Sequence, residues 1–329
     1  MSSNPPPPSL SVLDTIGNTP VVQLKRIVPE GSADVFVKLE YVSPTGSYKD
    51  RMAKSMIEKA ERRGDLTPNT TVVEATGGST GSALAFVCAV KGYNFMALSS
   101  DAYAQEKLQT MAAFGATVDI THSPTGKSTA DLMTSMKVRA AKIGSSDDYF
   151  HTDQFSNRDA LVGYAEIGHE LEKQFPDGFD TFCGAFGTAG MMMGVSSVLR
   201  VKRPDVRVVL LEPESSALLT TGRYESHSID GVAPGFISGH VNQDLYDEVR
   251  THEHLTVVRL EKNQSYLFLK TGRQMPQLAA QGGQFAEVGN TEKCRKTWPH
   301  QAVENCCGDR DDDGTAHHSE LGSCTHAGP

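Results

Sequence analysis

TVVEATGGSTGSALAFVCAVKGYNFMALS, residues 71–99, contains a strand, a glycine-rich turn, a helix and a second strand in that order. Residues 71–75 are rich in β-branched side chains and predict a buried strand. Residues 82–91 carry the apolar pattern of a helix, and Gly92 follows where that helix is expected to stop. Residues 95–99 predict the next strand. A helix that connects two consecutive strands is typical of a parallel sheet.

The same alternation continues on both sides of this segment. Strands are also expected at 34–40, 117–120, 179–185 and 206–212, and helices at 50–63, 105–114, 158–175 and 191–200. Gly64 and Gly115 stand where two of these helices are expected to stop. The pattern predicts an α/β protein with a mostly parallel sheet that helices cover on both faces.

Length, charge and composition exclude several classes of protein. A chain of 329 residues exceeds the usual size of one compact domain, so two lobes are expected. A net charge of -9 and the lack of a basic run argue against nucleic-acid binding. No stretch approaches the roughly 18 apolar residues of a membrane helix, and Met1–Pro8 lacks the apolar core of a signal peptide. We therefore expect a soluble, cytoplasmic protein.

The six cysteines do not predict a metal site. Cys88 and Cys183 lie in apolar segments and are expected to be inert core thiols. The remaining cysteines lie near the C-terminus, together with several histidines: Cys294, Cys306, Cys307, Cys324, His300, His317, His318 and His326. They lack the paired spacings of zinc ligands. Residues 286–329 have little periodic apolar signal, and we expect them to form an atypical, disordered tail.

Lys49 is the first candidate catalytic residue. It lies in Ser43-Pro-Thr-Gly-Ser-Tyr-Lys-Asp-Arg51, between a glycine-bearing turn and the expected start of a helix. Most lysines are solvated surface charges. The positive end of a helix, however, favours anions and lowers the cost of keeping an amine neutral. A neutral amine in such a place suits imine chemistry.

Two glycine-rich loops connect an expected strand to an expected helix. They are Thr76-Gly-Gly-Ser-Thr-Gly81 and Gly184-Ala-Phe-Gly-Thr-Ala-Gly190. Backbone N–H groups and the helix dipole bind anions at such turns. The same pattern also serves as an ordinary connector, and serine and threonine are preferred helix caps. A dinucleotide site at 184–190 is disfavoured because the loop lacks G-x-G-x-x-G spacing.

Together with Ile16-Gly-Asn-Thr-Pro20, these segments resemble the cysteine synthase and cystathionine β-synthase family, which uses pyridoxal 5'-phosphate. The resemblance runs from about residue 11 to about residue 285 and implies fold type II. In that fold, two lobes of mostly parallel twisted sheets flanked by helices enclose a cofactor cleft, as in tryptophan synthase β. The resemblance implies a smaller mobile substrate-binding lobe at 45–145, a larger cofactor-binding lobe at 11–44 and 146–285, and a homodimer.

The resemblance also implies roles for single residues. Lys49 would hold the cofactor as a Schiff base and then act as the base that removes the substrate α-proton. The residues expected to bind the cofactor are Lys49, Ser79, Gly184, Gly187, Thr188, Ala189, Gly190 and Gly231. The residues expected to bind the substrate are Thr76, Gly77, Gly78, Ser79, Thr80 and Gln154. No metal is expected.

The chain departs from the family pattern at several of these positions. Ser79 stands where the family commonly has an asparagine that contacts the ring oxygen of the cofactor. In the loop 184–190 the departures are Ala185, Phe186 and Ala189. The segment Asp230-Gly-Val-Ala-Pro-Gly-Phe236 resembles the family's glycine turn near the cofactor ring, and Ala233 and Pro234 depart from it. No residue of this chain is matched to the family's partner of the pyridine nitrogen.

The function that the resemblance implies is β-replacement on an O-activated serine through an aminoacrylate intermediate. The first choice is cysteine synthase action on O-acetylserine with sulfide. The alternatives are β-elimination, as in a cysteine desulfhydrase, a relative that uses another nucleophile, and a non-catalytic paralogue that kept the fold.

Overall fold

The computed structural model describes residues 9–26, 28, 32–225, 231–252, 256–258, 266–271, 277–281 and 284–288. From residue 252 onward only the backbone of these residues is described. The chain divides after Val288, and all described residues belong to the first part. Most of the expected tail, with its cysteines and histidines, therefore lies outside the described residues. Its first residues, 286–288, belong to a strand.

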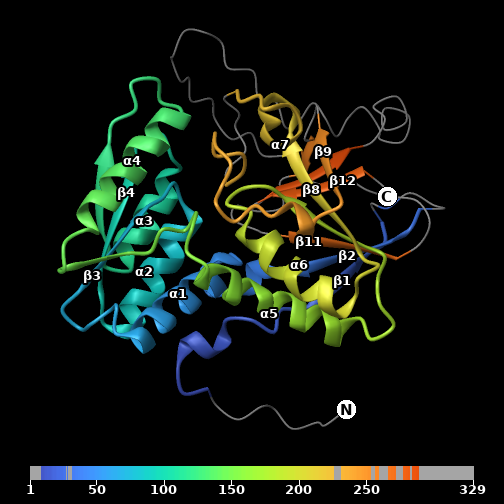
Figure 1. The fold of residues 1–329 in the computed structure, drawn as a ribbon, viewed down its shortest axis with the longest axis horizontal. Coiled ribbons are helices and arrows are strands. Elements are labelled where there is room, and N and C mark those ends of the chain that lie inside the picture. The colour runs from blue at the N-terminus through green and yellow to red at the C-terminus, as the bar shows by residue number, and fades with distance from the viewer. Residues whose placement is uncertain are drawn as a thin grey trace, which may run out of the picture. The chain divides into compact units, whose positions relative to one another are not determined.

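A four-stranded sheet is parallel throughout, as the sequence predicts. Its order is β5 (Thr117–Thr121), β4 (Asn94–Ser100), β3 (Thr71–Ala75) and β6 (Tyr149–His151). The helices of this region are α2 (Ser79–Lys91), α3 (Gln105–Ala113) and α4 (Ala130–Ile143). Figure 1 shows them around the sheet. The α/β prediction is confirmed, and α4 and β6 are additions that the sequence did not predict.

A six-stranded sheet contains the remaining long strands. Its order is β1 (Val21–Leu24), β2 (Asp34–Leu39), β11 (Tyr266–Thr271), β7 (Thr181–Ala185), β8 (Arg207–Pro213) and β9 (Glu248–His252). Strands β7, β8 and β9 are parallel, whereas β1 pairs antiparallel with β2, and β11 pairs antiparallel with β2 and β7. This sheet is therefore mixed, whereas a mostly parallel sheet was expected. The connection between β1 and β2 contains no crossover helix, which fits their antiparallel pairing.

The other described elements are short or lie outside these two sheets. A third sheet has three antiparallel strands in the order β10 (Thr256–Val258), β13 (Gln284–Val288) and β12 (Gln277–Gln281). The helices are α1 (Lys49–Arg63), α5 (Asp159–Gln174), α6 (Gly190–Lys202) and α7 (Leu218–Thr221), and the 3-10 turns are η1 (Val12–Thr15), η2 (Glu40–Val42), η3 (Glu214–Ser216) and η4 (Gln243–Leu245). No helix among the described residues is both long enough and apolar enough to cross a membrane.

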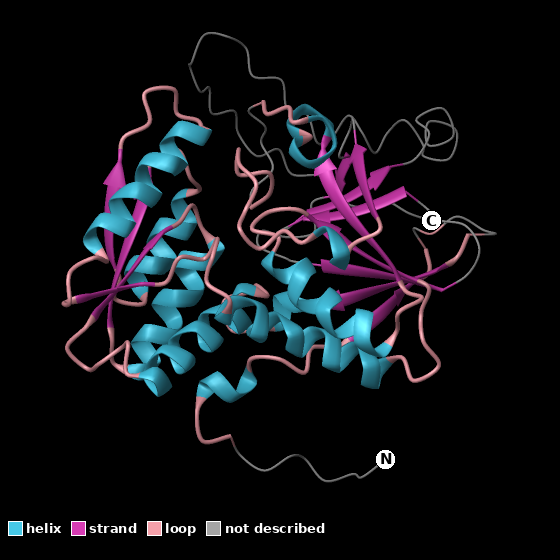
Figure 2. Cartoon of the chain, viewed as in Figure 1, coloured by secondary structure: helices cyan, strands magenta, loops and turns pink. Residues whose placement is uncertain are grey.

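Alternating side chains of β3 place apolar residues on both faces of the four-stranded sheet. Val72 belongs to a core with α2 residues such as Leu84, whereas Val73 packs with Met133 and Met136 of α4. Figure 2 shows the strands of this sheet between helices. Burial on both faces explains why β3 and β4 are predominantly apolar in sequence.

The helix stops at glycine agree with the sequence prediction. Gly64 and Gly92 follow α1 and α2 with φ of 81° and 82°, in the left-handed region that glycine adopts without strain. Both helices therefore end where the sequence predicts. The four-stranded sheet extends to His151, six residues past the expected end of the smaller lobe at 145. The division into lobes remains a proposal.

Candidate active site

Lys49 is the first residue of α1, and its side chain points into the protein. Only 8% of the residue is exposed. Its Nζ lies 3.5 Å from Thr188 Oγ1, and the rings of Tyr48 and Tyr164 have their centres 5.1 and 5.8 Å from it. Burial lowers the pKa of Lys49 to about 8, while the charge of Glu74 acts in the opposite direction. At pH 7 roughly a tenth of this amine is therefore neutral, and the neutral fraction reaches about half near pH 8.

The loop 184–190 forms a compact turn between β7 and α6. A Cβ built on Gly187 would lie 2.2 Å from Gly231 O, so no side chain is tolerated at that position. Ala233 N donates to Phe186 O at 2.9 Å, which also holds the 231–233 segment against the loop. Ala189 adopts φ of 59° at the cap of α6. The first N–H groups of α6 have no partner within the helix and suit an anion.

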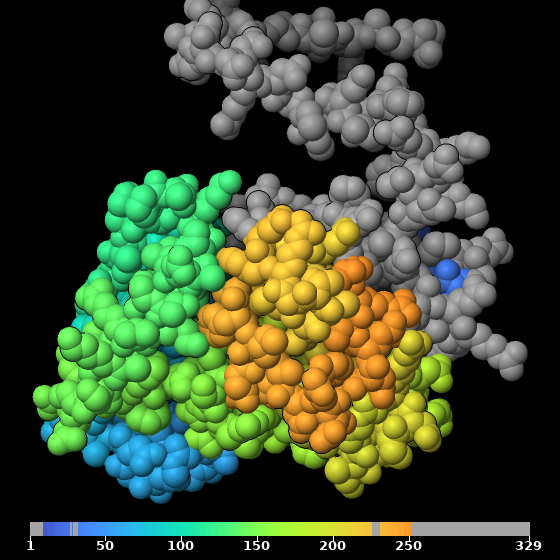
Figure 3. All heavy atoms as spheres, turned by 45° about the horizontal axis from the view of Figure 1, so that its top comes forward, coloured from blue at the N-terminus to red at the C-terminus, as the bar shows by residue number. Residues whose placement is uncertain are grey.

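The segment after Gly231 also contacts α4. A Cβ on Gly235 would lie 2.5 Å from Ala130 Cβ, and Lys137 Nζ lies 3.8 Å from the ring centre of Phe236. Figure 3 shows the orange surface of residues 231–252 next to the green surface near residues 125–145. The turn that contacts Gly187 is thus held from two sides.

The loop 76–81 and Gln154 lie together. Thr76 Oγ1 accepts hydrogen bonds from Gly78 N and Gly81 N at 3.2 and 3.0 Å. Thr80 Oγ1 donates to Gln154 Oε1 at 2.6 Å, and Gln154 Nε2 donates to Ala75 O at 2.9 Å. The structure therefore brings the expected substrate-binding residues into one place, with Ser79 as the first residue of α2.

Glu74 is a buried residue of this site that the sequence analysis missed. Its carboxylate accepts hydrogen bonds from Ala75 N at 2.9 Å, Thr152 Oγ1 at 2.6 Å and Gln154 N at 2.9 Å. Burial raises the pKa of Glu74 to about 7. Glu74 thus links the start of the 76–81 loop to the segment that carries Gln154. An acidic residue within an otherwise apolar strand was the available signal.

Glu74→Gln is expected to lower the pKa of Lys49 below about 8. The negative charge on Glu74 favours the ammonium form of Lys49, and the amide removes that charge. The pH at which added pyridoxal phosphate produces a visible absorption band should therefore move to a lower value. Glu166→Gln makes the same charge change at an exposed position of α5 and should leave this pH unchanged. An unchanged or higher value in Glu74→Gln would contradict the prediction.

His240 is a second missed residue, and no sequence pattern marked it. Its side chain is fully buried, and Nε2 lies 3.0 Å from Gln154 O. Because a carbonyl oxygen only accepts, Nε2 carries a proton, and burial lowers the pKa of His240. A Cβ on Gly190 would lie 3.5 Å from its ring. Within the described part of the chain, its Nδ1 has no hydrogen-bond partner.

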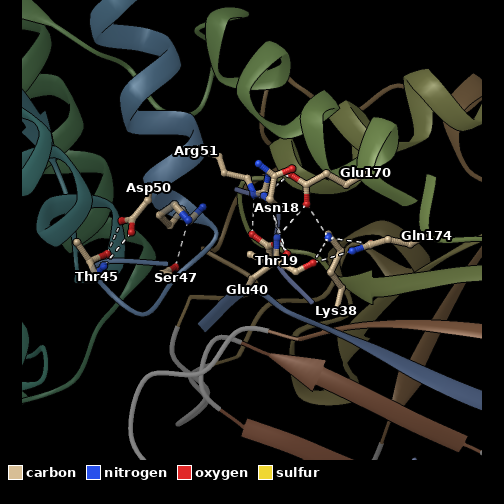
Figure 4. Close-up of polar contacts among 11 residues, drawn as sticks. Asn18, Thr19, Lys38, Glu40, Thr45, Ser47, Asp50, Arg51, Glu170 and Gln174 are labelled. Atoms are coloured by element: carbon tan, nitrogen blue, oxygen red, sulfur yellow. Dashed lines mark hydrogen bonds and ion pairs between the residues drawn. The ribbon is translucent and has the colours of Figure 1, made fainter. Parts of the chain in front are cut away.

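A buried ionic network fixes the start of α1 (Figure 4). Arg51 Nε contacts Glu40 Oε2 at 2.7 Å, and Arg51 Nη1 contacts Glu170 Oε1 at 2.6 Å. Lys38 Nζ contacts Glu170 Oε2 at 2.7 Å. Thr19 Oγ1 donates to Glu40 Oε1 at 2.7 Å. The Ile16–Pro20 motif therefore has a structural role, since it helps to hold the turn from which Lys49 projects.

Comparisons with known proteins agree on one family. The family model described as "Pyridoxal-phosphate dependent enzyme" matches residues 12–267. Cysteine synthase from Staphylococcus aureus (strain N315) is 39% identical over 241 residues, which cover 73% of this chain and 76% of that protein.

Two solved structures are similar over most of their length. O-ureido-L-serine synthase has a TM-score of 0.71 and 37% identity, with 76% of this chain and 78% of that chain covered. A hydrogen sulfide-producing enzyme from Fusobacterium nucleatum has a TM-score of 0.68 and 33% identity, with 74% of this chain and 81% of that chain covered.

Proposed function

Because the chain belongs to the pyridoxal-phosphate dependent enzyme family, we propose that it catalyses β-replacement on an O-activated serine, as cysteine synthases do. The matched relatives confirm the family resemblance that the sequence motifs indicate. They include cysteine synthase and O-ureido-L-serine synthase, whose names both describe synthesis of a β-substituted amino acid.

The observation that carries this proposal is the buried amine of Lys49 beside the loop 184–190. The residues present fit an anionic cofactor with an aldehyde. The amine has a pKa lowered to about 8, and Thr188 Oγ1 lies 3.5 Å from it at the N-terminal end of α6. The close contact of Gly187 with Gly231 leaves backbone, not side chain, to line the turn. When bound, pyridoxal phosphate supplies an electron sink for the amino-acid substrate.

Separate groups of residues are proposed to bind the phosphate, to bind the substrate carboxylate and to move the α-proton. Gly187, Thr188 and Gly190 are proposed to hold the phosphate. Gly184 near the end of β7, Ala189 at the cap of α6, and Gly231, which contacts Gly187 from a separate segment, are proposed to complete this site. Thr76, Thr80 and Gln154 are proposed to bind the substrate carboxylate, with the backbone of Gly77, Gly78 and Ser79. Lys49 is proposed to take the α-proton, which its lowered pKa and its position at the loop support.

Other properties of the enzyme rest on the family resemblance. These proposals are a homodimer, a cytoplasmic location, and a smaller lobe at 45–145 with a larger lobe at 11–44 and 146–285. Size-exclusion chromatography with light scattering measures the molar mass in solution and so tests the homodimer.

Product analysis tests the proposed reaction. The purified protein should show a visible band that shifts on addition of O-acetyl-L-serine, and it should form cysteine when sulfide is present. Release of pyruvate and sulfide from cysteine alone would instead favour β-elimination. The similarity to a hydrogen sulfide-producing enzyme makes this the second candidate. A protein that takes up no pyridoxal phosphate would contradict both reactions and favour a non-catalytic role.

A further inference from the structure

Tyr103 occupies the space in which a side chain at position 77 would lie. A Cβ built on Gly77 would be 2.5 Å from Cε1 and 2.8 Å from Cδ1 of the Tyr103 ring. Such contacts are closer than van der Waals packing allows. Gly77 follows β3 and Tyr103 follows β4, and these two strands are parallel neighbours. Their carboxyl ends therefore meet at one edge of the sheet, which is where ligands bind in open α/β sheets.

The chain fixes the Tyr103 ring in this position. The ring packs against the apolar cluster that contains Ala75 and Leu98. Ser128 Oγ donates to Tyr103 OH at 3.1 Å, and Ser123 N donates to Asp101 Oδ1 at 2.7 Å. The ring is thus held by the core beneath it and by the 123–128 segment beside it.

Lys107, four residues after Tyr103, lies next to the second glycine of the loop, Gly78. A Cβ on Gly78 would lie 3.4 Å from Cγ of Lys107, which belongs to α3. Gly77 and Gly78 therefore face the side chains of Tyr103 and Lys107, which both follow β4 in the chain. Tyr103 blocks position 77 completely, while Lys107 is in ordinary contact distance of position 78.

We propose that Tyr103, whose ring fills the space left by the missing side chain of Gly77, is a specificity-determining residue. It restricts the substrate to an amino acid with a compact β-substituent. This inference rests on the proposed function, which places the substrate at the loop 76–81. The backbone of the loop and Gln154 bind the polar part of the substrate. The ring of Tyr103 limits the volume beside them, so an acetyl group fits and a longer acyl chain does not.

Substrate competition tests the role of the ring. The ratio of kcat/KM for O-acetyl-L-serine to that for O-butanoyl-L-serine should fall about tenfold in Tyr103→Ala, because the truncation opens room for the longer chain. Tyr103→Phe should keep the wild-type ratio, since the ring volume is retained. Tyr93→Ala is the matched control, because Tyr93 is a half-buried tyrosine whose hydroxyl donates to Glu61 at 3.0 Å.

A double-mutant cycle tests whether the effects of Gly77 and Tyr103 on KM depend on each other. Gly77→Ala should raise KM for O-acetyl-L-serine about tenfold, because the added methyl displaces the ring. In Gly77→Ala with Tyr103→Ala, KM should return to the value of Tyr103→Ala alone. An unchanged substrate ratio in Tyr103→Ala, or strictly additive effects of the two changes on KM, would overturn the inference.

The visible band separates this result from a failure of the proposed function. A wild-type protein with neither band nor turnover would contradict the proposed function and this inference with it. If the wild type shows the visible band and turns over O-acetyl-L-serine, but Tyr103→Ala has the same kcat/KM ratio for the two substrates as the wild type, only this inference is contradicted.

Discussion

Lys49→Ala should remove the visible absorption band and lower kcat by roughly 10³-fold or more, because one side chain is proposed both to hold the cofactor and to move the proton. The buried amine lies 3.5 Å from Thr188 Oγ1, at the N-terminal end of α6. The measurements are the absorption spectrum after addition of pyridoxal phosphate and cysteine formation from O-acetyl-L-serine and sulfide.

Two control variants make this result specific. Lys59→Ala removes the same charge from the same helix at a half-exposed position and should retain band and turnover. Lys49→Arg keeps a cation near Thr188 but cannot form an imine, so it should behave like Lys49→Ala. If Lys49→Arg or Lys49→Ala retained the band, another amine would hold the cofactor and the assignment of Lys49 would be wrong.

The local part of the fold could be predicted from the sequence. Residues 71–75 form a strand as expected, and the helices before Gly64 and Gly92 end as expected. Each of these elements has a complete local signal, namely an apolar run or a helical pattern followed by a glycine. The signal of α4 was present in Met133, Met136 and Ala140, but the polar residues at 123–129 before it hid its start.

Long-range polar contacts could not be predicted in the same way. Lys38 and Glu170 meet in the fold although 132 positions separate their numbers, and neither has a local pattern that indicates a partner. Glu74 and His240 differ from solvated residues of the same type only by their burial. The approach of Lys49 to Thr188 was expected only through the family resemblance. Composition and periodicity carry no information on such pairs.

Arg51→Met should destabilise the protein by about 3–5 kcal/mol, because it leaves Glu40 and Glu170 as buried carboxylates without their main partner. Arg51 is 4% exposed and bonds both carboxylates. Burial raises the pKa of Glu170, but the hydrogen bonds and charges of Arg51, and then of Lys38, outweigh it and hold the pKa at about 2. The midpoint of urea unfolding, followed by circular dichroism, measures the loss.

The pH dependence of that loss distinguishes the network from simple packing. Because the pKa of Glu170 is lower in the folded protein than its ordinary value of 4.5, its contribution is present above pH 4.5 and is lost as the pH falls toward about 2. The difference between wild type and Arg51→Met should therefore shrink on acidification. Arg223→Ala, which removes an exposed arginine that pairs with Glu225, should leave the midpoint unchanged at every pH. A deficit in Arg51→Met that stayed constant from neutral pH to the acid range would mean that lost side-chain packing, and not the unpaired carboxylates, causes the instability.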